Sequence, residues 1–258
     1  MNTFRATIRL ATYSVVTAAC FLVWVAGLIL AAWIPNWRMS WRCFMFRRWA
    51  QWVSRILGIR LQIVGTPPKP PFFLVTNHLG YLDIVLLASQ LNTRFLGKLD
   101  VAGWPLLGPL GRCMGTVFID RTSRRDLLRV NDELEHIVIR EREGVVAFPE
   151  GTSSGGWDVL PFKPSILDFA ARLEYPVHFA SISYQTPRGE PHASEAVCWW
   201  GDMSFRGHFF NLLRLSAIDS KLVFGPNPIR ASDRKTLASR LRESVTELFT
   251  PMNSPEPS

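Results

Sequence analysis

The sequence predicts an α/β fold, in which a single domain with one mixed sheet and flanking helices follows an N-terminal membrane helix and an interfacial helix. From residue 59 onward, short apolar runs alternate with segments of helical periodicity, which is the element order of an α/β domain. The residues before that point are rich in tryptophan and include a long uncharged run. We therefore expect an anchor and interfacial segment at residues 1–58, the α/β domain at 59–250 and a disordered tail at 251–258.

The first element is the uncharged run at residues 11–34, which has 24 residues. At about 1.5 Å per residue, a helix of this length crosses the roughly 30 Å hydrocarbon core of a bilayer. A cleaved signal peptide is the alternative, but its apolar region usually has only about 7 to 15 residues. The sequence therefore favours a retained membrane helix.

Arginine and aromatic residues are interleaved in the next segment, residues 37–55. Tryptophan at the depth of the lipid headgroups and arginine beside anionic lipid are typical of a membrane interface. If the preceding run spans the bilayer, the arginine excess after it favours a position of the following domain on the cytoplasmic side of the cell (inner) membrane.

The most informative motif follows the apolar run 72–75, where His78 and Asp83 are five residues apart. A regular helix would turn two such residues roughly 140° apart, so we expect His78 in the turn before a helix and Asp83 in its first turn. Gly80 permits that turn. A carboxylate bonded to one ring nitrogen leaves the other nitrogen to take a proton from a hydroxyl. The pair suits acyl transfer to an alcohol, although an Asp that caps a helix beside a turn His gives the same pattern.

Two further apolar runs end in polar residues. Residues 115–121 predict a buried strand that ends in Asp120 and Arg121, and residues 145–152 predict a strand that ends in a Pro-Glu-Gly turn. The carboxyl ends of strands are the edge of an α/β sheet where sites are built. Both runs are therefore candidate parts of a site.

With these three motifs in this order, over roughly residues 72–184, the chain resembles the glycerolipid acyltransferase family, which includes the lysophosphatidate acyltransferases. The resemblance implies that His78 is the general base on the acceptor hydroxyl and that Asp83 is its partner. It also implies that the hydroxyl attacks an acyl thioester directly, without an acyl-enzyme, while backbone N–H groups stabilise the oxyanion. The co-substrate would be acyl-coenzyme A or acyl–acyl carrier protein, and no cofactor is expected.

The same resemblance implies the substrate contacts. Arg121 and Lys98 would hold the anionic head group of a membrane lipid acceptor, while Glu150, Gly151 and Thr152 would shape the acceptor site beside the base. The alternatives are an ion pair of Arg121 with a neighbour and a solvated Lys98 at a strand end. For the N-terminal segment, the resemblance implies two helices lying in one leaflet instead of one spanning helix, and the sequence leaves both arrangements open.

The chain departs from the family pattern at two positions. Ser153 stands where members that act on phosphate-bearing acceptors usually have an arginine, and a hydroxyl does not replace a guanidinium fork for phosphate. The run 151–165 is more similar to the branch that acylates lyso-ornithine lipid, but Arg121 keeps lysophosphatidate open. Phe179 stands where a second proline is usual, in the strand that would contact the acyl donor.

Two other function classes remain open. Residues 151–155 form a literal Gly-x-Ser-x-Gly around Ser153, which is the pattern of a serine hydrolase or esterase. A nucleophile elbow needs a helix after the serine, whereas glycine and proline follow here. The other alternative is a non-catalytic lipid-binding membrane protein, against which the His78 and Asp83 pair argues because binding alone requires no base.

The chain carries 29 basic and 21 acidic residues, a net charge of +8. The arginines cluster beside the apolar run and no nucleic-acid motif is present, so we expect an anionic membrane surface as partner and no nucleic acid. The same positive charge would attract an acidic acyl carrier protein or coenzyme A.

The cysteines show no paired spacing, and the remaining histidines form no ligand pattern with them. We therefore expect reduced cysteines, no metal, and a surface position for His208. The residues concerned are Cys20, Cys43, Cys113, Cys198, His136, His178, His192 and His208.

The other segments are interpreted as scaffold. Residues 123–142 predict an amphipathic helix, and residues 176–184, 195–200 and 221–224 predict strands. The last helix is expected to begin near Ser232.

Overall fold

The computed structural model describes residues 2–31, 37–104 and 107–252. These residues form a seven-stranded sheet in the order β1-β7-β6-β2-β5-β3-β4. Neighbouring strands are parallel except β6 and β7, which are antiparallel. The prediction of one mixed sheet with flanking helices is confirmed. The strands are β1 Ile59–Val64, β2 Phe72–Thr76, β3 Thr93–Lys98, β4 Val117–Ile119, β5 Gly144–Ala147, β6 Val177–Gln185 and β7 Ile218–Phe224.

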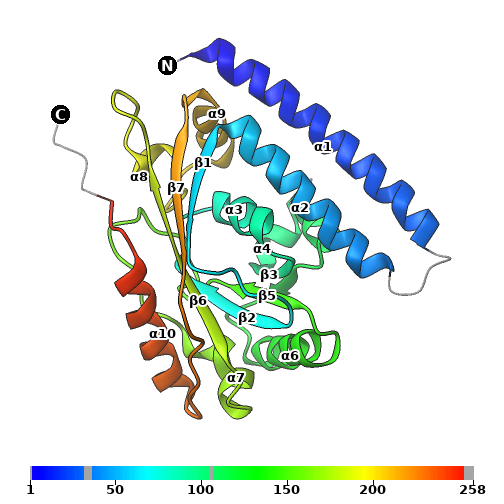
Figure 1. Cartoon of the computed structure of the whole chain (residues 1–258), viewed down its shortest axis with the longest axis vertical. Helices are drawn as coiled ribbons and strands as arrows, with labels where there is room; N and C mark the ends of the chain where they lie inside the picture. The colour runs from blue at the N-terminus through cyan, green and yellow to red at the C-terminus, as the bar shows by residue number, and fades with distance from the viewer. Residues whose placement is uncertain (1, 32–36, 105–106, 253–258) are drawn as a thin grey trace.

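Helices cover both faces of the sheet (Figure 1). Phe72 and Leu74 of β2 join the core on the side of α2, α3 and α9, while Phe73 and Val75 join the core on the side of α6, α7 and α10. This alternation follows from the two-residue period of a strand, and burial of both faces makes β2 a continuous apolar run. The α-helices are α1 Thr3–Ala31, α2 Trp37–Leu57, α3 Leu82–Gln90, α4 Leu99–Ala102, α5 Leu107–Cys113, α6 Arg124–Glu135, α7 Asp168–Arg172, α8 Ala193–Ala196, α9 Phe205–Arg214 and α10 Arg234–Leu248.

Helices α1 and α2 form an antiparallel hairpin along one side of the domain (Figure 1). Within the described residues, one helical stretch, Thr3–Ile29, is long and apolar enough to cross a membrane, with a mean hydropathy of 1.9. Residues 32–34 of the predicted uncharged run lie outside the described residues. Large apolar side chains are exposed along α1. They include Phe4, Ile8, Val15, Leu22 and Ile29.

Both arms of the hairpin are hydrogen-bonded to the domain. Near the start of α1, Arg5 Nη1 donates to the carbonyl of Arg214 at 3.0 Å and Arg9 Nη1 donates to that of Leu215 at 2.6 Å, so two guanidinium groups cap the end of α9. On α2, Arg47 Nε donates to the carbonyl of Ser89 in α3 at 3.3 Å. The hairpin is thus held against the domain along its length.

Two scaffold helices begin close to the predicted positions. The Ser123 hydroxyl accepts the N–H of Asp126 and caps α6, which continues through a π-helical turn at His136–Arg140. Asp233 caps α10 in the same way, through the N–H of Thr236. Both caps satisfy amide groups that the first turn of a helix leaves free.

The predicted strand at 195–200 is wrong. The segment contains the end of α8 followed by a loop, because its backbone bonds go elsewhere: the N–H of Cys198 donates to the carbonyl of Ala193, and the N–H of Trp199 donates to that of Leu79, both within 3 Å. After Glu195 the segment is a continuous apolar run, and its burial comes from the end of a short helix and a loop instead of a strand.

Two further predictions fail. His208 is buried instead of exposed, because α9 turns it inward to the hydroxyl of Tyr81, 2.9 Å from its Nδ1. Met252 is also buried, and its N–H donates to the carbonyl of Gly156 at 2.9 Å. The predicted disorder of the tail therefore does not hold at Met252, and residues 253–258 lie outside the described residues.

Candidate active site

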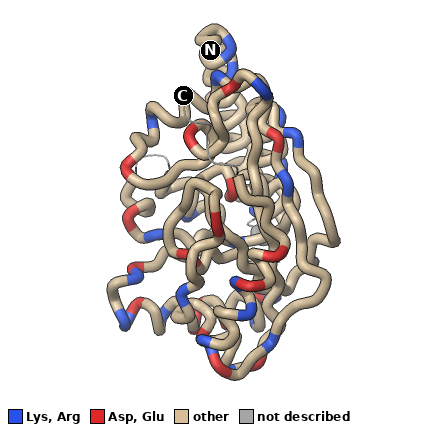
Figure 2. The backbone as a smooth tube through the Cα atoms, turned by 90° about the vertical axis from the view of Figure 1, so that its left-hand side faces the viewer, with Lys and Arg blue, Asp and Glu red and all other residues tan. Residues whose placement is uncertain are grey.

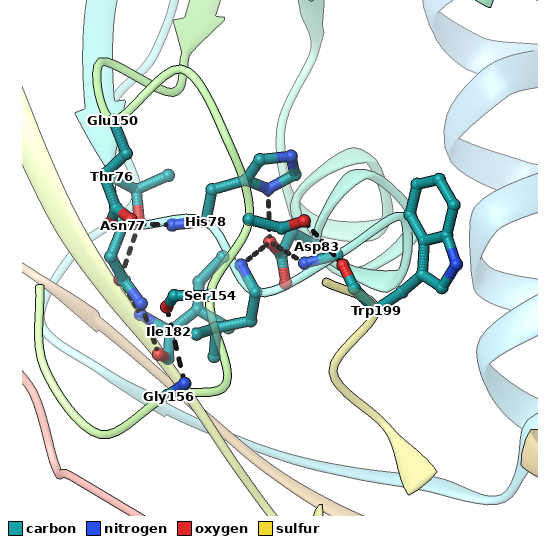
Figure 3. A network of polar contacts seen from close by, with 12 residues as sticks. Thr76, Asn77, His78, Asp83, Glu150, Ser154, Gly156, Ile182 and Trp199 are labelled. Carbon is teal, nitrogen blue, oxygen red and sulfur yellow. Dashed lines mark hydrogen bonds and ion pairs between the residues drawn. The ribbon is translucent and has the colours of Figure 1, made fainter. Parts of the chain in front are cut away.

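The structure brings His78 and Asp83 together in the turn between β2 and α3. The Nδ1 atom of His78 lies 2.7 Å from Oδ2 of Asp83, and Asp83 lies in the first turn of α3, as the spacing predicted (Figure 3). Gly80 has a φ of 154°, and a Cβ at this position would lie 2.9 Å from the Trp199 nitrogen. Glycine is therefore required on both conformational and steric grounds.

Asp83 is fully buried, and each group that is hydrogen-bonded to its carboxylate acts as a donor. Its Oδ2 also accepts the N–H groups of Leu79 at 2.7 Å and Gly80 at 3.1 Å, and its Oδ1 accepts the hydroxyl of Tyr184 at 2.7 Å. A buried carboxylate is costly unless such bonds satisfy it. Burial, and secondarily the negative charge of Asp83, raise the pKa of Tyr184 well above its usual value, so Tyr184 stays a neutral donor. The carboxylate is thus fixed as an acceptor for the Nδ1–H of His78.

The imidazole of His78 lies flat on Phe148, with ring centroids 4.1 Å apart. Its side chain remains 22% exposed, and the ring edge that carries Nε2 faces away from Asp83 (Figure 3). With Nδ1 occupied, Nε2 is the nitrogen that a substrate hydroxyl can reach.

Glu150 supports the backbone of the base. Its Oε1 accepts the N–H of His78 at 3.1 Å, and the N–H of Ser154 in the same loop donates to the carbonyl of His78 at 3.0 Å (Figure 3). Burial raises the pKa of Glu150 to about 8, with a smaller contribution from the charge of Asp83. The third motif therefore holds the peptide of His78 between two hydrogen bonds.

Two cationic side chains converge beside this loop. Arg121, which follows β4, donates from Nη1 to the carbonyl of Gly151. Gly151 has a φ of 78°, and a Cβ there would lie 2.9 Å from both Arg121 Nη1 and Lys163 Nζ. Neither cation forms an ion pair with a carboxylate in the part of the chain that the structure describes. Burial lowers the pKa of Arg121, as expected for a cation without an acidic partner.

The remaining residues singled out from the sequence are Lys98, Thr152 and Ser153, and none of them contacts His78 or Asp83 through its side chain among the described residues. Lys98 lies at the end of β3, where it contacts Asp100, and its side chain is 63% exposed. Thr152 is exposed. The hydroxyl of Ser153 donates to the carbonyl of Trp199 at 2.5 Å, and within the described residues it has no histidine partner. A serine held in this way has no base to activate it.

Sequence reasoning missed Lys163 and Tyr184. Lys163 stands in a proline-flanked loop without a recognisable pattern, and Tyr184 lies 101 residues from the carboxylate it contacts. A tyrosine in a segment predicted to be a strand was the one available signal, since a buried hydroxyl needs a partner.

This geometry is suited to activating a hydroxyl for group transfer, because a histidine with an orienting carboxylate and an open Nε2 lies at the carboxyl ends of the strands of an α/β sheet. The acyltransferase family model matches residues 60–184. The chain is 35% identical over 200 residues to the lyso-ornithine lipid O-acyltransferase of Rhodobacter capsulatus, covering 74% of this chain and 70% of that protein. It is 32% identical over 210 residues to the enzyme of the same name from Brucella abortus, covering 76% and 78%. The chain therefore belongs to the acyltransferase family and is an acyltransferase.

The crystal structure of the 1-acyl-sn-glycerophosphate (LPA) acyltransferase from Thermotoga maritima has the same fold. It matches 96% of this chain and 98% of its own chain with a TM-score of 0.67, at 18% sequence identity. The similarity extends through the N-terminal hairpin as well as the α/β domain.

Proposed function

We propose that this chain is a membrane-bound O-acyltransferase that moves a fatty acyl chain from an acyl thioester to the free hydroxyl of a lysolipid. The candidate reactions are lyso-ornithine lipid to ornithine lipid and 1-acylglycerol-3-phosphate to phosphatidic acid. The observation that carries the proposal is the 2.7 Å contact between His78 and Asp83, which leaves Nε2 exposed on the edge that also presents Arg121.

His78 acts as general base in this mechanism. Its Nε2 takes the proton of the acceptor hydroxyl while the oxygen attacks the thioester carbonyl. When the tetrahedral intermediate collapses, the carbon–sulfur bond breaks and the imidazolium returns the proton to the departing thiolate. Asp83 stabilises the positive charge that the ring carries between these steps. No acyl-enzyme is needed, since Ser153 is bonded to a carbonyl instead of a base.

Arg121 and Lys163 provide the head-group site. Their proximity at Gly151 offers two cations to a phosphate or a carboxylate. Lyso-ornithine lipid, which carries a carboxylate, is the preferred acceptor of this proposal for two reasons. Ser153 removes one guanidinium from the third motif, and two similar proteins bear the name lyso-ornithine lipid O-acyltransferase.

The contacts of the hairpin favour two helices in one leaflet over a spanning helix. A span would separate the start of α1 from the domain by a bilayer, but Arg5 and Arg9 bond to the end of α9 while α2 packs on α3. In this arrangement the domain lies on the cytoplasmic side of the cell membrane, where acyl carrier protein and coenzyme A thioesters are made. The anchor then raises the effective concentration of an acceptor that stays in the bilayer.

The test is an acylation assay with membranes that contain the enzyme, in which lyso-ornithine lipid and lysophosphatidate are offered side by side with each thioester donor. We expect turnover of lyso-ornithine lipid with the higher kcat/KM, loss of turnover in His78→Ala and retention of it in Ser153→Ala. Turnover that survives His78→Ala would refute the mechanism. Labelling of Ser153 by a fluorophosphonate would favour a hydrolase, and lysolipid binding without turnover of either donor would favour a lipid-binding protein.

A further inference from the structure

A cavity lined by both polar and apolar residues lies at the opposite ends of the strands from His78. It has a volume of about 490 Å³ and is bordered by Pro70, Asn92 and Gly144, which stand at the amino ends of β2, β3 and β5. These strands run parallel, so their other ends carry the catalytic edge. The length of β2, five residues at roughly 3.3 Å each, separates the two edges by about 16 Å. The cavity is therefore no part of the acyl-transfer site.

Three arginines line this cavity, Arg47 and Arg48 of α2 and Arg142 before β5. Arg47 is anchored through Nε to the carbonyl of Ser89, and neither of its Nη groups has a hydrogen-bond partner among the described residues. Arg48 lies over the ring of Phe44, with its central carbon 5.2 Å from the centroid. Such stacking holds a planar guanidinium in place for a ligand.

Arg142 has an unusual backbone. Its φ is 57°, in the left-handed region, which costs a residue other than glycine about 1 kcal/mol or more. Its side chain is exposed, and no carboxylate contacts it among the described residues. Arg142 borders the cavity, and its positive charge also acts on Tyr175, where it partly offsets the burial that raises the pKa of that tyrosine.

The acid in the cavity wall does not offset these charges. Glu143 is buried and contacts both Arg42 and Arg94, and Arg94 Nε lies 2.9 Å from its Oε2. Its single negative charge is therefore shared between two arginines that are themselves half-buried. By contrast, acidic and basic residues are interspersed over the side of the molecule that lies on the left in Figure 1 (Figure 2). The cavity is a local site of uncompensated positive charge.

The position of the cavity indicates where its ligand comes from. One wall is α2, the interfacial arm of the hairpin, and Phe44 in that wall is 47% exposed. An arginine cluster beside exposed aromatic residues at a membrane interface is suited to an anionic lipid. Guanidinium forks match the oxygens of a phosphodiester, and the volume lies in the range of small-ligand pockets.

We propose that this cavity binds the phosphate of an anionic membrane phospholipid, held by Arg47, Arg48 and Arg142, while its acyl chains follow the exposed side of α2 into the bilayer. The bound lipid is neither acceptor nor product, and it fixes how the hairpin and the domain sit on the membrane. The proposal rests on the membrane attachment argued above and not on the roles of His78 and Asp83.

The test measures binding without turnover. The full chain in a nonionic detergent is titrated with short-chain phosphatidylglycerol, short-chain phosphatidylcholine and inorganic phosphate. The measured quantity is the heat of binding or the rise in the unfolding temperature of the protein. The double variant Arg48→Gln, Arg142→Gln is compared with the control Arg55→Gln, Arg124→Gln. Each pair removes one charge from α2 and one from the α/β domain, and the control residues do not line the cavity.

We expect saturable binding of phosphatidylglycerol that weakens about tenfold or more in the cavity variant, as the loss of charge-assisted hydrogen bonds implies, and less than about twofold in the control, since exposed charges act weakly. Equal weakening in both variants would show a diffuse field and overturn the proposal. Binding of inorganic phosphate as tight as that of the lipid would also overturn the proposal, because the site would then serve a dissolved anion. The variant His78→Ala should bind phosphatidylglycerol as tightly as wild type does. The outcome of this test is therefore independent of the catalytic proposal.

Discussion

Replacing Asp83 by asparagine separates the charge of the carboxylate from its geometry. Three donors meet at Oδ2, namely the N–H groups of Leu79 and Gly80 and the Nδ1–H of His78, while the hydroxyl of Tyr184 meets Oδ1. An asparagine satisfies all of them only with its carbonyl at the Oδ2 position and its NH₂ group toward the Tyr184 oxygen, which can accept as well as donate. The two backbone N–H groups therefore dictate the amide orientation, and His78 keeps its Nδ1–H tautomer.

The expected cost of Asp83→Asn follows from that geometry. Where a triad carboxylate is replaced and the tautomer is lost, the rate falls by about 10⁴. Here the tautomer is retained and only the stabilisation of the imidazolium is lost, so we expect kcat to fall by about 10² to 10³, which corresponds to roughly 3 to 4 kcal/mol. The free energy of unfolding should change little, because weaker hydrogen bonds are offset by the removal of a buried charge.

The assay is a comparison of kcat for wild type, Asp83→Asn, Asp83→Ala and His78→Ala with one thioester and one acceptor, with thermal unfolding as the control for folding. Asp83→Ala leaves both backbone N–H groups without a partner and should be less stable than Asp83→Asn. A fall of less than tenfold in Asp83→Asn would refute the electrostatic role of the carboxylate. A fall of about 10⁴ in Asp83→Asn, the size given above for loss of the tautomer, would refute the retained tautomer.

Three further predictions follow from the site. His78→Ala should lower kcat by about 10² to 10⁴ without unfolding the protein, whereas Ser153→Ala, which loses one bond to a carbonyl, should stay within about tenfold of wild type in the same assay. Arg121→Ala should raise the acceptor KM by about tenfold or more, with a smaller rise for Lys98→Ala because that residue is exposed and paired with Asp100; an unchanged KM in Arg121→Ala would remove it from the head-group site. Glu150, with its pKa raised to about 8 by burial, binds a proton more tightly in the folded state, so the free energy of unfolding should fall as pH rises between about 4.5 and 8, by at most about 1.4 kcal/mol per unit. Denaturation from pH 5 to 8.5 should show that fall in wild type and not in Glu150→Gln, and identical pH profiles would contradict the burial argument.

The part of the fold that sequence could predict is the part encoded by local patterns. The buried run of β2, the glycine at position 80 and the five-residue spacing from His78 to Asp83 together determine the turn between strand and helix, and each can be derived from the period of its element. Residues 195–200 show where this reasoning ends. Their apolar run is compatible with a buried strand, but the amide of Trp199 bonds to the turn after His78 instead of a neighbouring strand.

The contacts that fix the base come from segments far apart in sequence. Tyr184 on β6 orients Asp83, Glu150 after β5 holds the amide of His78, and Trp199 bonds to both the turn after His78 and the third motif through Leu79 and Ser153. None of these partners carries a periodic signal, since each depends on which strands become neighbours. The order β6-β2-β5 is what places the first two on either side of β2.

This arrangement also explains why the third motif can lose an arginine without losing its place in the site. Residue 153 contributes its hydroxyl to the carbonyl of Trp199, and Glu150 and Ser154 hold the backbone of His78 whatever side chain stands between them. The head group of the proposed acceptor is then left to Arg121 and Lys163, which reach the same loop at Gly151 from β4 and from the segment after the motif. In the mechanism proposed above, support of the base and recognition of the acceptor are therefore carried by different atoms of one loop.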